Sequence, residues 1–287
     1  MIYINLPEFY SNYSIINFLS NIPRDYFKIE TTFSSVGGNF PYCYWNGGFN
    51  NNINNNMGKF PLYQEIIGYI NEINIPIRFN CSNIYLTDND LLDEMGNLIL
   101  ELGQNGGNQI AISNISFYEK LKEKFPNYSF IFSREANLIY PMTPEIINTI
   151  IEQDIFKLIE IPVNKSKDLD FIKQIKNRKK IEIQINSLCR INCNNFNDCK
   201  YHEHYAQYNY SGINNYFSCN KKNNYSNSGL ISFDDIVNIY YPLGIKNYSI
   251  ASNLFFEGKE LLFYLLKTFI KEDKIALLYE KYMRGAA

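Results

Sequence analysis

Short strand patterns and helix patterns alternate along this whole chain, and this alternation constrains the fold more than any other feature. Eight stretches have the length and apolar content of β-strands, and amphipathic stretches separate them. The predicted strands cover residues 3–6, 26–33, 76–80, 109–112, 128–132, 156–161, 181–185 and 248–251. The predicted helices cover residues 14–21, 62–73, 88–102, 116–124, 143–151, 167–175, 232–241 and 257–271.

About eight successive β–α units, with no low-complexity linker between them, predict an α/β fold. We expect a (β/α)8 TIM-like barrel that forms a single domain over residues 1–287. The alternative is an open doubly wound sheet. No GxGxxG or GxxxxGK[ST] motif follows any predicted strand, which disfavours a nucleotide-binding version of that alternative.

Several predicted strands carry polar residues at alternate positions, although the strands of a parallel barrel are usually apolar on both faces. Because the helices must cover an apolar outer face, we expect the polar set to point into the barrel. That set is Lys28, Glu30 and Thr32; Arg78 and Asn80; Glu160; and Glu182, Gln184 and Asn186.

A buried Arg78 needs partners, and Glu30, Glu160 and Glu182 are the candidates. One interpretation is a polar cavity for an anionic or hydrogen-bonding substrate, with Arg78 and Glu182 as catalytic candidates and Asn80 and Asn186 as substrate contacts. The alternatives are a structural ion network and a polar face that is simply exposed.

Four of the six cysteines lie close together directly after the seventh predicted strand, in a segment that covers residues 186–230. Cys189, Cys193, Cys199 and Cys219 supply four thiolates, which suit either a [4Fe–4S] cluster or tetrahedral zinc. Zinc sites usually pair two short Cys-x2–4-Cys units, whereas Cys219 is single and distant, so the spacing favours the cluster. Four ordinary reduced cysteines are the alternative.

Both histidines of the protein follow Cys199 in the run KYHEHYAQ. His202 and His204 could be metal ligands, acid–base groups or surface residues. We take His204 as a catalytic candidate and its neighbour Tyr205 as a substrate contact. Cys81 follows a predicted strand and could face the same cavity, but a small buried side chain is the simpler interpretation.

The loop GGNFPYCYWNGGFN holds the only tryptophan, Trp45, next to Asn46. A loop after the second strand of a barrel lies on the rim where active sites are built. Trp45 and Asn46 are therefore predicted to contact substrate, and a surface loop with an aromatic anchor is the alternative.

Composition and motifs disfavour several classes of function. The formal net charge of -2 gives no global basic field that would demand nucleic acid or an anionic membrane, and a local basic patch is the alternative that it leaves open. No apolar run approaches the ~18–20 residues that span a bilayer, and the N-terminus does not resemble a signal peptide, so we expect a cytoplasmic protein with no membrane partner. The chain has no GxSxG or HExxH motif, and the cysteine spacing departs from the radical S-adenosylmethionine pattern.

Four stretches of the chain together resemble motifs of the peptidase U32-like family. They are the run INSLCRINCNNFNDCKYHEHY, the Trp-Asn-Gly-Gly loop, the strand IPIRFNCSN and the segment ISFDDIVNIYYPLGIKNYSIAS. The resemblance covers about residues 1–270 and implies a TIM-like barrel with a [4Fe–4S] cluster. By position, Cys189, Cys193, Cys199 and Cys219 would hold the cluster, and His204 with Tyr205 would match the His-Tyr pair of the family.

Members of that family include proteins described as peptidases and proteins that support oxygen-independent hydroxylation of RNA bases or of the ubiquinone ring, with prephenate as the oxygen donor. This chain departs from the pattern at Phe49, Ser249 and Asn253, where the family carries cations. The missing cations argue against an anionic substrate such as prephenate.

The sequence thus predicts an iron–sulfur enzyme that modifies an RNA base, a peptide or a small molecule, with an electron donor or partner protein. A U32-type peptidase is the enzymatic alternative. The non-enzymatic alternative is a binding protein in which a structural zinc ion holds the cysteine loop together.

Overall fold

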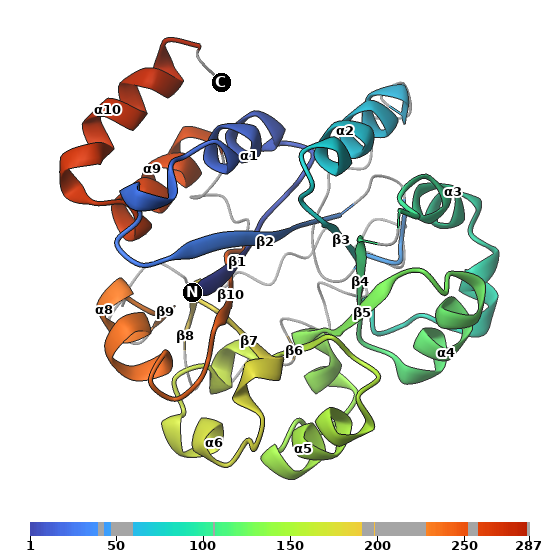
Figure 1. The fold of residues 1–287 in the computed structure, drawn as a ribbon. Helices are drawn as coiled ribbons and strands as arrows, with labels where there is room; N and C mark the ends of the chain where they lie inside the picture. The colour runs from blue at the N-terminus through green and yellow to red at the C-terminus, as the bar shows by residue number, and fades with distance from the viewer. Residues whose placement is uncertain are drawn as a thin grey trace.

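The computed structural model of the chain describes residues 1–39, 43–46, 60–105, 107–190, 198, 228–251 and 258–285. Eight parallel strands form a closed barrel in the order β1-β10-β7-β6-β5-β4-β3-β2, and helices surround it (Figure 1). The predicted (β/α)8 TIM-like barrel is therefore confirmed.

The barrel strands are β1 (Ile2–Leu6), β2 (Thr31–Gly38), β3 (Ile77–Cys81), β4 (Gln109–Ile112), β5 (Ser129–Phe132), β6 (Leu158–Glu160), β7 (Ile181–Gln184) and β10 (Asn247–Ser249). The helices are α1 (Tyr13–Ser20), α2 (Phe60–Glu72), α3 (Glu94–Leu102), α4 (Ile115–Lys124), α5 (Pro144–Gln153), α6 (Leu169–Lys173), α8 (Phe233–Asp235), α9 (Gly258–Phe269) and α10 (Glu272–Met283). A short antiparallel pair, β8 (Asn186–Arg190) with β9 (Ser228–Leu230), forms a second sheet, and a π-helix over Ile236–Tyr240 continues α8.

Helix starts follow the local sequence. The Asn114 side chain accepts hydrogen bonds from the amides of Ser116 and Phe117 and so caps α4. Thr143 caps α5 in the same way, and Pro144 occupies the first turn, where its missing N–H costs nothing. The predicted helix 88–102 divides in two, because a 3-10 turn over Asp88–Leu92 ends at Asp93, which then caps α3.

Alternate residues of each strand point to opposite sides of the barrel wall. Ile77 and Phe79 of β3, and Ile181 and Ile183 of β7, belong to the main apolar core, which packs against the helices. A second, separate apolar cluster consists of the inward-facing Ala111, Ile131 and Leu158. The remaining inward positions are largely polar, as the alternation of β3, β6 and β7 predicted.

The predicted second strand is displaced, and this is the main error of the sequence interpretation. The segment around Phe27 and Lys28 bonds to the end of α9, through a bridge from Phe27 to Ile270 and a 2.8 Å bond from Lys28 N to Phe269 O. The barrel strand therefore begins only at Thr31. Glu30 lies outside the barrel with 54% of its side chain exposed, so the expected pairing of Glu30 with Arg78 is wrong.

Candidate functional site

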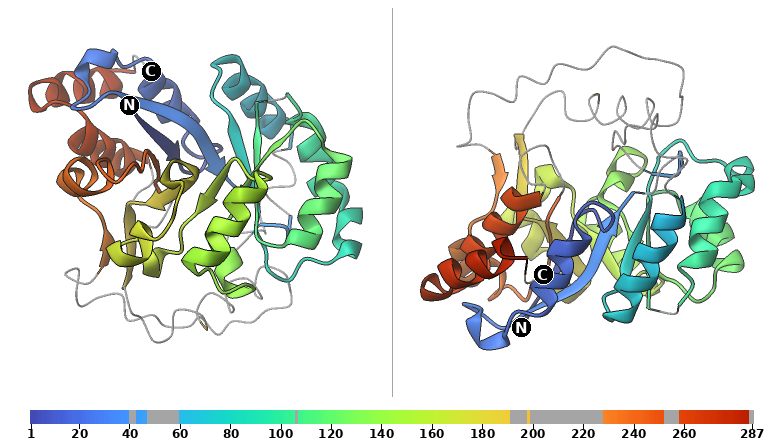
Figure 2. Two further views of the ribbon diagram at one scale, coloured as in Figure 1. Left: turned by 60° about the horizontal axis from the view of Figure 1, so that its bottom comes forward. Right: turned by 90° about the horizontal axis from the view of Figure 1, so that it is seen from above.

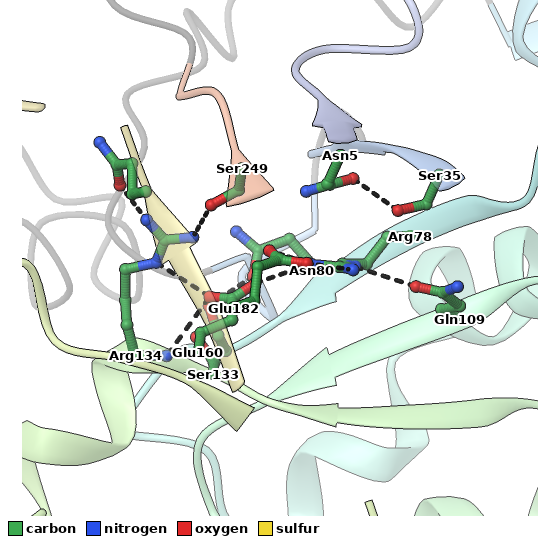
Figure 3. A network of polar contacts seen from close by, with 12 residues as sticks. Asn5, Ser35, Arg78, Asn80, Gln109, Ser133, Arg134, Glu160, Glu182 and Ser249 are labelled. Carbon is green, nitrogen blue, oxygen red and sulfur yellow. Dashed lines mark hydrogen bonds and ion pairs between the residues drawn. The ribbon is translucent and has the colours of Figure 1, made fainter. Parts of the chain in front are cut away.

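Four charged side chains of alternating sign form a continuous chain inside the barrel (Figure 3). Arg78 makes a two-pronged contact with Glu182, with Nη1–Oε1 at 2.7 Å and Nη2–Oε2 at 2.9 Å. Arg78 Nη1 also lies 3.0 Å from Glu160 Oε1, and Arg134 Nε lies 2.9 Å from Glu160 Oε2. The predicted pairing of Arg78 with Glu160 and Glu182 is confirmed.

Strand register explains why this chain of charges forms. Glu160 of β6 and Glu182 of β7 are direct partners on neighbouring strands, so their two carboxylates project side by side into the interior. Such like charges repel unless a cation separates them. Arg78 comes from β3, which is not adjacent to β6 or β7 in the barrel, and it reaches across the interior to bond to both carboxylates.

Burial increases towards the inner end of the network. The exposed fractions of the side chains are 16% for Arg134, 7% for Glu160, 3% for Arg78 and 1% for Glu182. Arg134 follows β5 at its C-terminal end, whereas Arg78 is the second residue of β3. The charged chain therefore runs from the C-terminal mouth of the barrel into its interior, and the mouth is the end at which barrel enzymes place their active sites.

The electrostatics favour the ionised forms of Glu160, Arg78 and Arg134. Burial opposes ionisation of Glu160, but the charges of Arg134 and Arg78 outweigh it and hold the pKa of this carboxyl below its usual value. Burial likewise lowers the pKa of Arg78 and of Arg134, and the neighbouring glutamates more than compensate, so that both pKa values are raised. These three groups therefore carry their charges in a poorly solvated space.

Neutral polar groups complete the network. Gln109 Oε1 accepts a 3.0 Å bond from Arg78 Nε, and Arg134 donates to Gln184 Oε1 and to Ser249 Oγ, the latter at 3.1 Å. Further along the wall, Asn80 Nδ2 donates to Asn39 Oδ1 at 2.8 Å. The predicted substrate contact Asn80 therefore shares the interior with Arg78.

Sequence reasoning missed Arg134, which is the most exposed of the four charged side chains of the network. Its guanidinium reaches Glu160 on β6, Gln184 on β7 and Ser249 on β10. Arg134 lies outside the strand pattern, so periodicity could not point to it. The available signal was its position two residues after the apolar run of β5, on the rim of a predicted barrel.

Trp45 and Asn46 lie apart from the network. The Trp45 side chain is fully buried, donates from Nε1 to Asp90 O at 2.9 Å and meets the ring of Phe117 edge-on. Asn46 is also buried and donates to Cys43 O at 2.8 Å. The indole has no exposed surface in this structure, so its packing favours the aromatic-anchor alternative.

The Asn186 side chain links the two chain segments that follow β7 and β10. Its Nδ2 donates to Ala251 O at 2.9 Å, and its Oδ1 accepts from Ala251 N at 2.7 Å. The side chain thus takes the place of a backbone partner and joins the start of β8 to the end of β10. Its predicted contact with substrate stays a prediction.

The predicted metal ligands fall only partly within the described structure. Cys189 lies on β8, which follows β7 after a single residue and stands with β9 beyond the barrel (Figure 2). Cys193, Cys199, Cys219, His204 and Tyr205 lie outside the described residues, as does His202. Among the described residues, no cluster of three or more His, Cys, Asp or Glu side chains could hold a metal ion.

The two remaining cysteines are buried free thiols. Cys43 Sγ donates to Asp93 Oδ2 at 3.6 Å, and burial raises the pKa of both the Cys43 and the Cys81 thiol. Cys81 belongs to the apolar core and alternates with the inward-facing Asn80, so it packs outside the barrel wall. The simpler interpretation of Cys81, a small buried residue, agrees with this packing.

Comparison with known proteins gives a fold relationship. No family model matches the sequence, and no curated protein matches it. A solved structure described as the U32 peptidase Mk0906 superposes with a TM-score of 0.58 over 88% of this chain and 93% of that chain, at 9% sequence identity. The chain therefore has the fold of a U32 peptidase, which agrees with the resemblance of its motifs.

None of the described helices has the length and apolar character that a crossing of the bilayer requires.

Proposed function

We propose that this chain is an iron–sulfur enzyme of the U32-like kind that acts on a substrate at the C-terminal mouth of its barrel. The observation that carries the proposal is the chain of four charges from Arg134, which is partly buried, to Glu182, which is fully buried. Buried ion pairs cost desolvation energy, and well-packed apolar residues often replace them with no loss of stability. Four charges in a barrel interior therefore suggest a requirement beyond folding.

The metal centre is proposed on Cys189, Cys193, Cys199 and Cys219. Four thiolates are the donor set of a [4Fe–4S] cluster, and the attachment of β8 to the end of β7 supports a site near the mouth. A bound cluster would supply electrons to the reaction or bind the oxygen donor. If it supplies electrons, an external electron donor or a partner protein would be required to reduce it.

The residues of the network would hold and orient the substrate. Arg134 is the most exposed of the four charges and retains N–H groups that can bind a ligand oxygen. Arg78 and Glu182 would keep the inner wall fixed, and His204 would move a proton. The proposed reaction is an oxygen-independent hydroxylation or related modification of an RNA base, a peptide or a small molecule. In a hydroxylation, an organic oxygen donor would transfer an oxygen atom to the substrate, which loses two electrons, and the donor would be reduced by the same two electrons.

Peptide hydrolysis is the second candidate, because the protein of similar fold is described as a U32 peptidase. The ranges that the structure describes contain no histidine and hence no Ser-His-Asp set. A peptidase would therefore need His202 or His204, or a metal-bound water held by the cysteine segment.

Metal analysis of anaerobically purified protein tests the proposal. A brown protein with about four iron and four sulfide per chain is expected for one [4Fe–4S] cluster. Cys199→Ala should lose the iron, whereas Cys81→Ala removes a buried thiol outside the proposed ligand set and should keep it. A colourless protein with one zinc per chain would overturn the proposal of a cluster and favour the non-catalytic binding protein with a structural zinc ion.

A second assay separates the two enzymatic candidates. Peptide cleavage is measured with the intact protein and with protein from which iron has been removed. Cleavage that persists without iron would favour the peptidase, and its absence from both samples would favour the cluster-dependent reaction.

A further inference from the structure

Four inward-facing residues on neighbouring strands form a continuous row near the mouth of the barrel. Ser35 of β2 pairs in register with Asn5 of β1, Asn5 with Ser249 of β10, and Ser249 with Gln184 of β7. Arg134 reaches this row from the end of β5 and bonds to both Ser249 and Gln184. The row and Arg134 thus form one polar surface that faces into the barrel (Figure 3).

Arg134 fixes the orientation of its two neutral partners. A guanidinium can only donate hydrogen bonds, so Gln184 must present its carbonyl oxygen to Arg134 and turn its NH2 group elsewhere. For the same reason, Ser249 Oγ accepts from Arg134, and its own hydrogen is left to donate. The Gln184 NH2 group and the Ser249 hydroxyl are therefore hydrogen-bond donors that can bind a neighbouring acceptor.

Asn5 adds another donor. Ser35 Oγ donates to Asn5 Oδ1 at 2.8 Å, and the Asn5 amide nitrogen has no partner among the described residues. In Figure 3 this nitrogen points toward the side on which Ser249 lies. Arg134 itself uses one N–H from each of its three nitrogens in contacts with Glu160, Gln184 and Ser249, which leaves two of its five N–H groups.

These donors are accessible within the interior. In the described part of the chain, the fully buried side-chain atoms without a partner are the Oδ1 atoms of Asn71 and Asn164. The amide nitrogens of Asn5 and Gln184 are not among them, although both residues are more than nine-tenths buried. They therefore border open space, and a ligand acceptor there would satisfy them.

Charge balance selects the kind of acceptor. Arg78 and Arg134 are matched by Glu160 and Glu182, so the network is neutral as a whole. A carboxylate ligand would leave a net negative charge in a poorly solvated space, which is costly. The oxygen of an uncharged carbonyl accepts the same hydrogen bonds without that cost.

We propose that Asn5, Ser249, Gln184 and Arg134 form a donor-only subsite for the carbonyl oxygens of an uncharged ligand, such as an amide. This inference rests on the proposed function only in taking the mouth as the ligand site. It predicts that an amide is preferred over the carboxylate of the same shape.

The test compares N-acetylglycinamide with N-acetylglycine by ligand-observed NMR titration of the whole chain. The amide is expected to bind several-fold more tightly. Gln184→Glu keeps the acceptor for Arg134 but replaces the NH2 donor by a carboxylate oxygen, so it should weaken amide binding by about tenfold or more. Ser249→Ala removes one donor and should weaken it by about two- to tenfold.

Gln174→Glu is the matched control, because it makes the same chemical change on an exposed residue outside the barrel. Thermal melting of each variant shows that it is folded. Tighter binding of the acid, binding of neither probe, or equal affinity in Gln184→Glu and Gln174→Glu would overturn the subsite. Binding is measured without turnover, so a metal analysis that finds no cluster would remove the proposed enzyme and leave this subsite standing.

Discussion

Arg78 and Glu182 face each other across the interior of the barrel, although they lie on β3 and β7, which are separated by three strands in the order of the sheet. Both side chains are almost fully buried, and two parallel hydrogen bonds of 2.7 and 2.9 Å join them. Such a pair holds two distant parts of the wall in one geometry. It also makes each partner costly to remove alone.

Removal of one partner should therefore destabilise the protein strongly. Arg78→Met leaves Glu182 buried without its cation, and we expect a loss of about 3–5 kcal/mol in the free energy of unfolding. The double variant Arg78→Met/Glu182→Met should lose less than the sum of the two single variants. Urea unfolding measures all three, and strictly additive losses would contradict the coupling.

Acid should weaken the fold through Glu160. Because its folded pKa lies below the unfolded value of about 4.3, the ionised carboxylate contributes stability above that pH, and this contribution is lost as the pH falls through the folded pKa. Glu160→Gln should lower stability at neutral pH and reduce the acid-dependent loss. Urea midpoints between about pH 7 and pH 3 measure this, and an unchanged pH dependence in the variant would assign the effect to other groups.

Because Trp45 is the only tryptophan, the tryptophan fluorescence of the protein reports on the packing around this indole. A Cβ at Gly96 would lie 2.8 Å from two ring atoms of this indole, so Gly96→Ala should cost about 1–3 kcal/mol. Gly68→Ala is the control, because nothing lies within 4 Å of its added Cβ, and a helical alanine should be neutral or stabilising by up to about 1 kcal/mol. Both are measured by Trp45 fluorescence during urea unfolding; equal stability of the two variants would contradict the tight packing.

Asn186 should protect the backbone amide of Ala251 from hydrogen exchange. Asn186→Ala removes the 2.7 Å bond to that amide and leaves a carbonyl without its donor, which should cost about 1–3 kcal/mol. The neighbouring amide of Ile250 bonds to Asn5 O at 3.0 Å and serves as the internal control. Loss of protection at Ala251 with retention at Ile250 is expected. Equal loss at both positions would indicate general unfolding of the segment instead.

Local pattern predicted much of this molecule, because strand alternation and helix periodicity are properties of short stretches. The inward direction of Arg78, Glu160 and Glu182 followed from alternation once the outer faces had been assigned to the helices. Lys28 and Glu30 have the same alternation, yet they lie outside the barrel because Phe27 and Lys28 bond to α9. A contact more than two hundred residues away in the chain decided that boundary.

The sequence by itself determined the class of fold, the polar lining of the barrel and two of the three partners considered for Arg78. Tertiary structure alone decided that Arg134, outside every strand pattern, joins three strands at the mouth. It also decided that Trp45 anchors the packing around α3 and α4, with its indole fully buried. The physical reason is that periodicity fixes the direction of a side chain, whereas its partners depend on register and closure of the barrel, which bring together residues far apart in the chain.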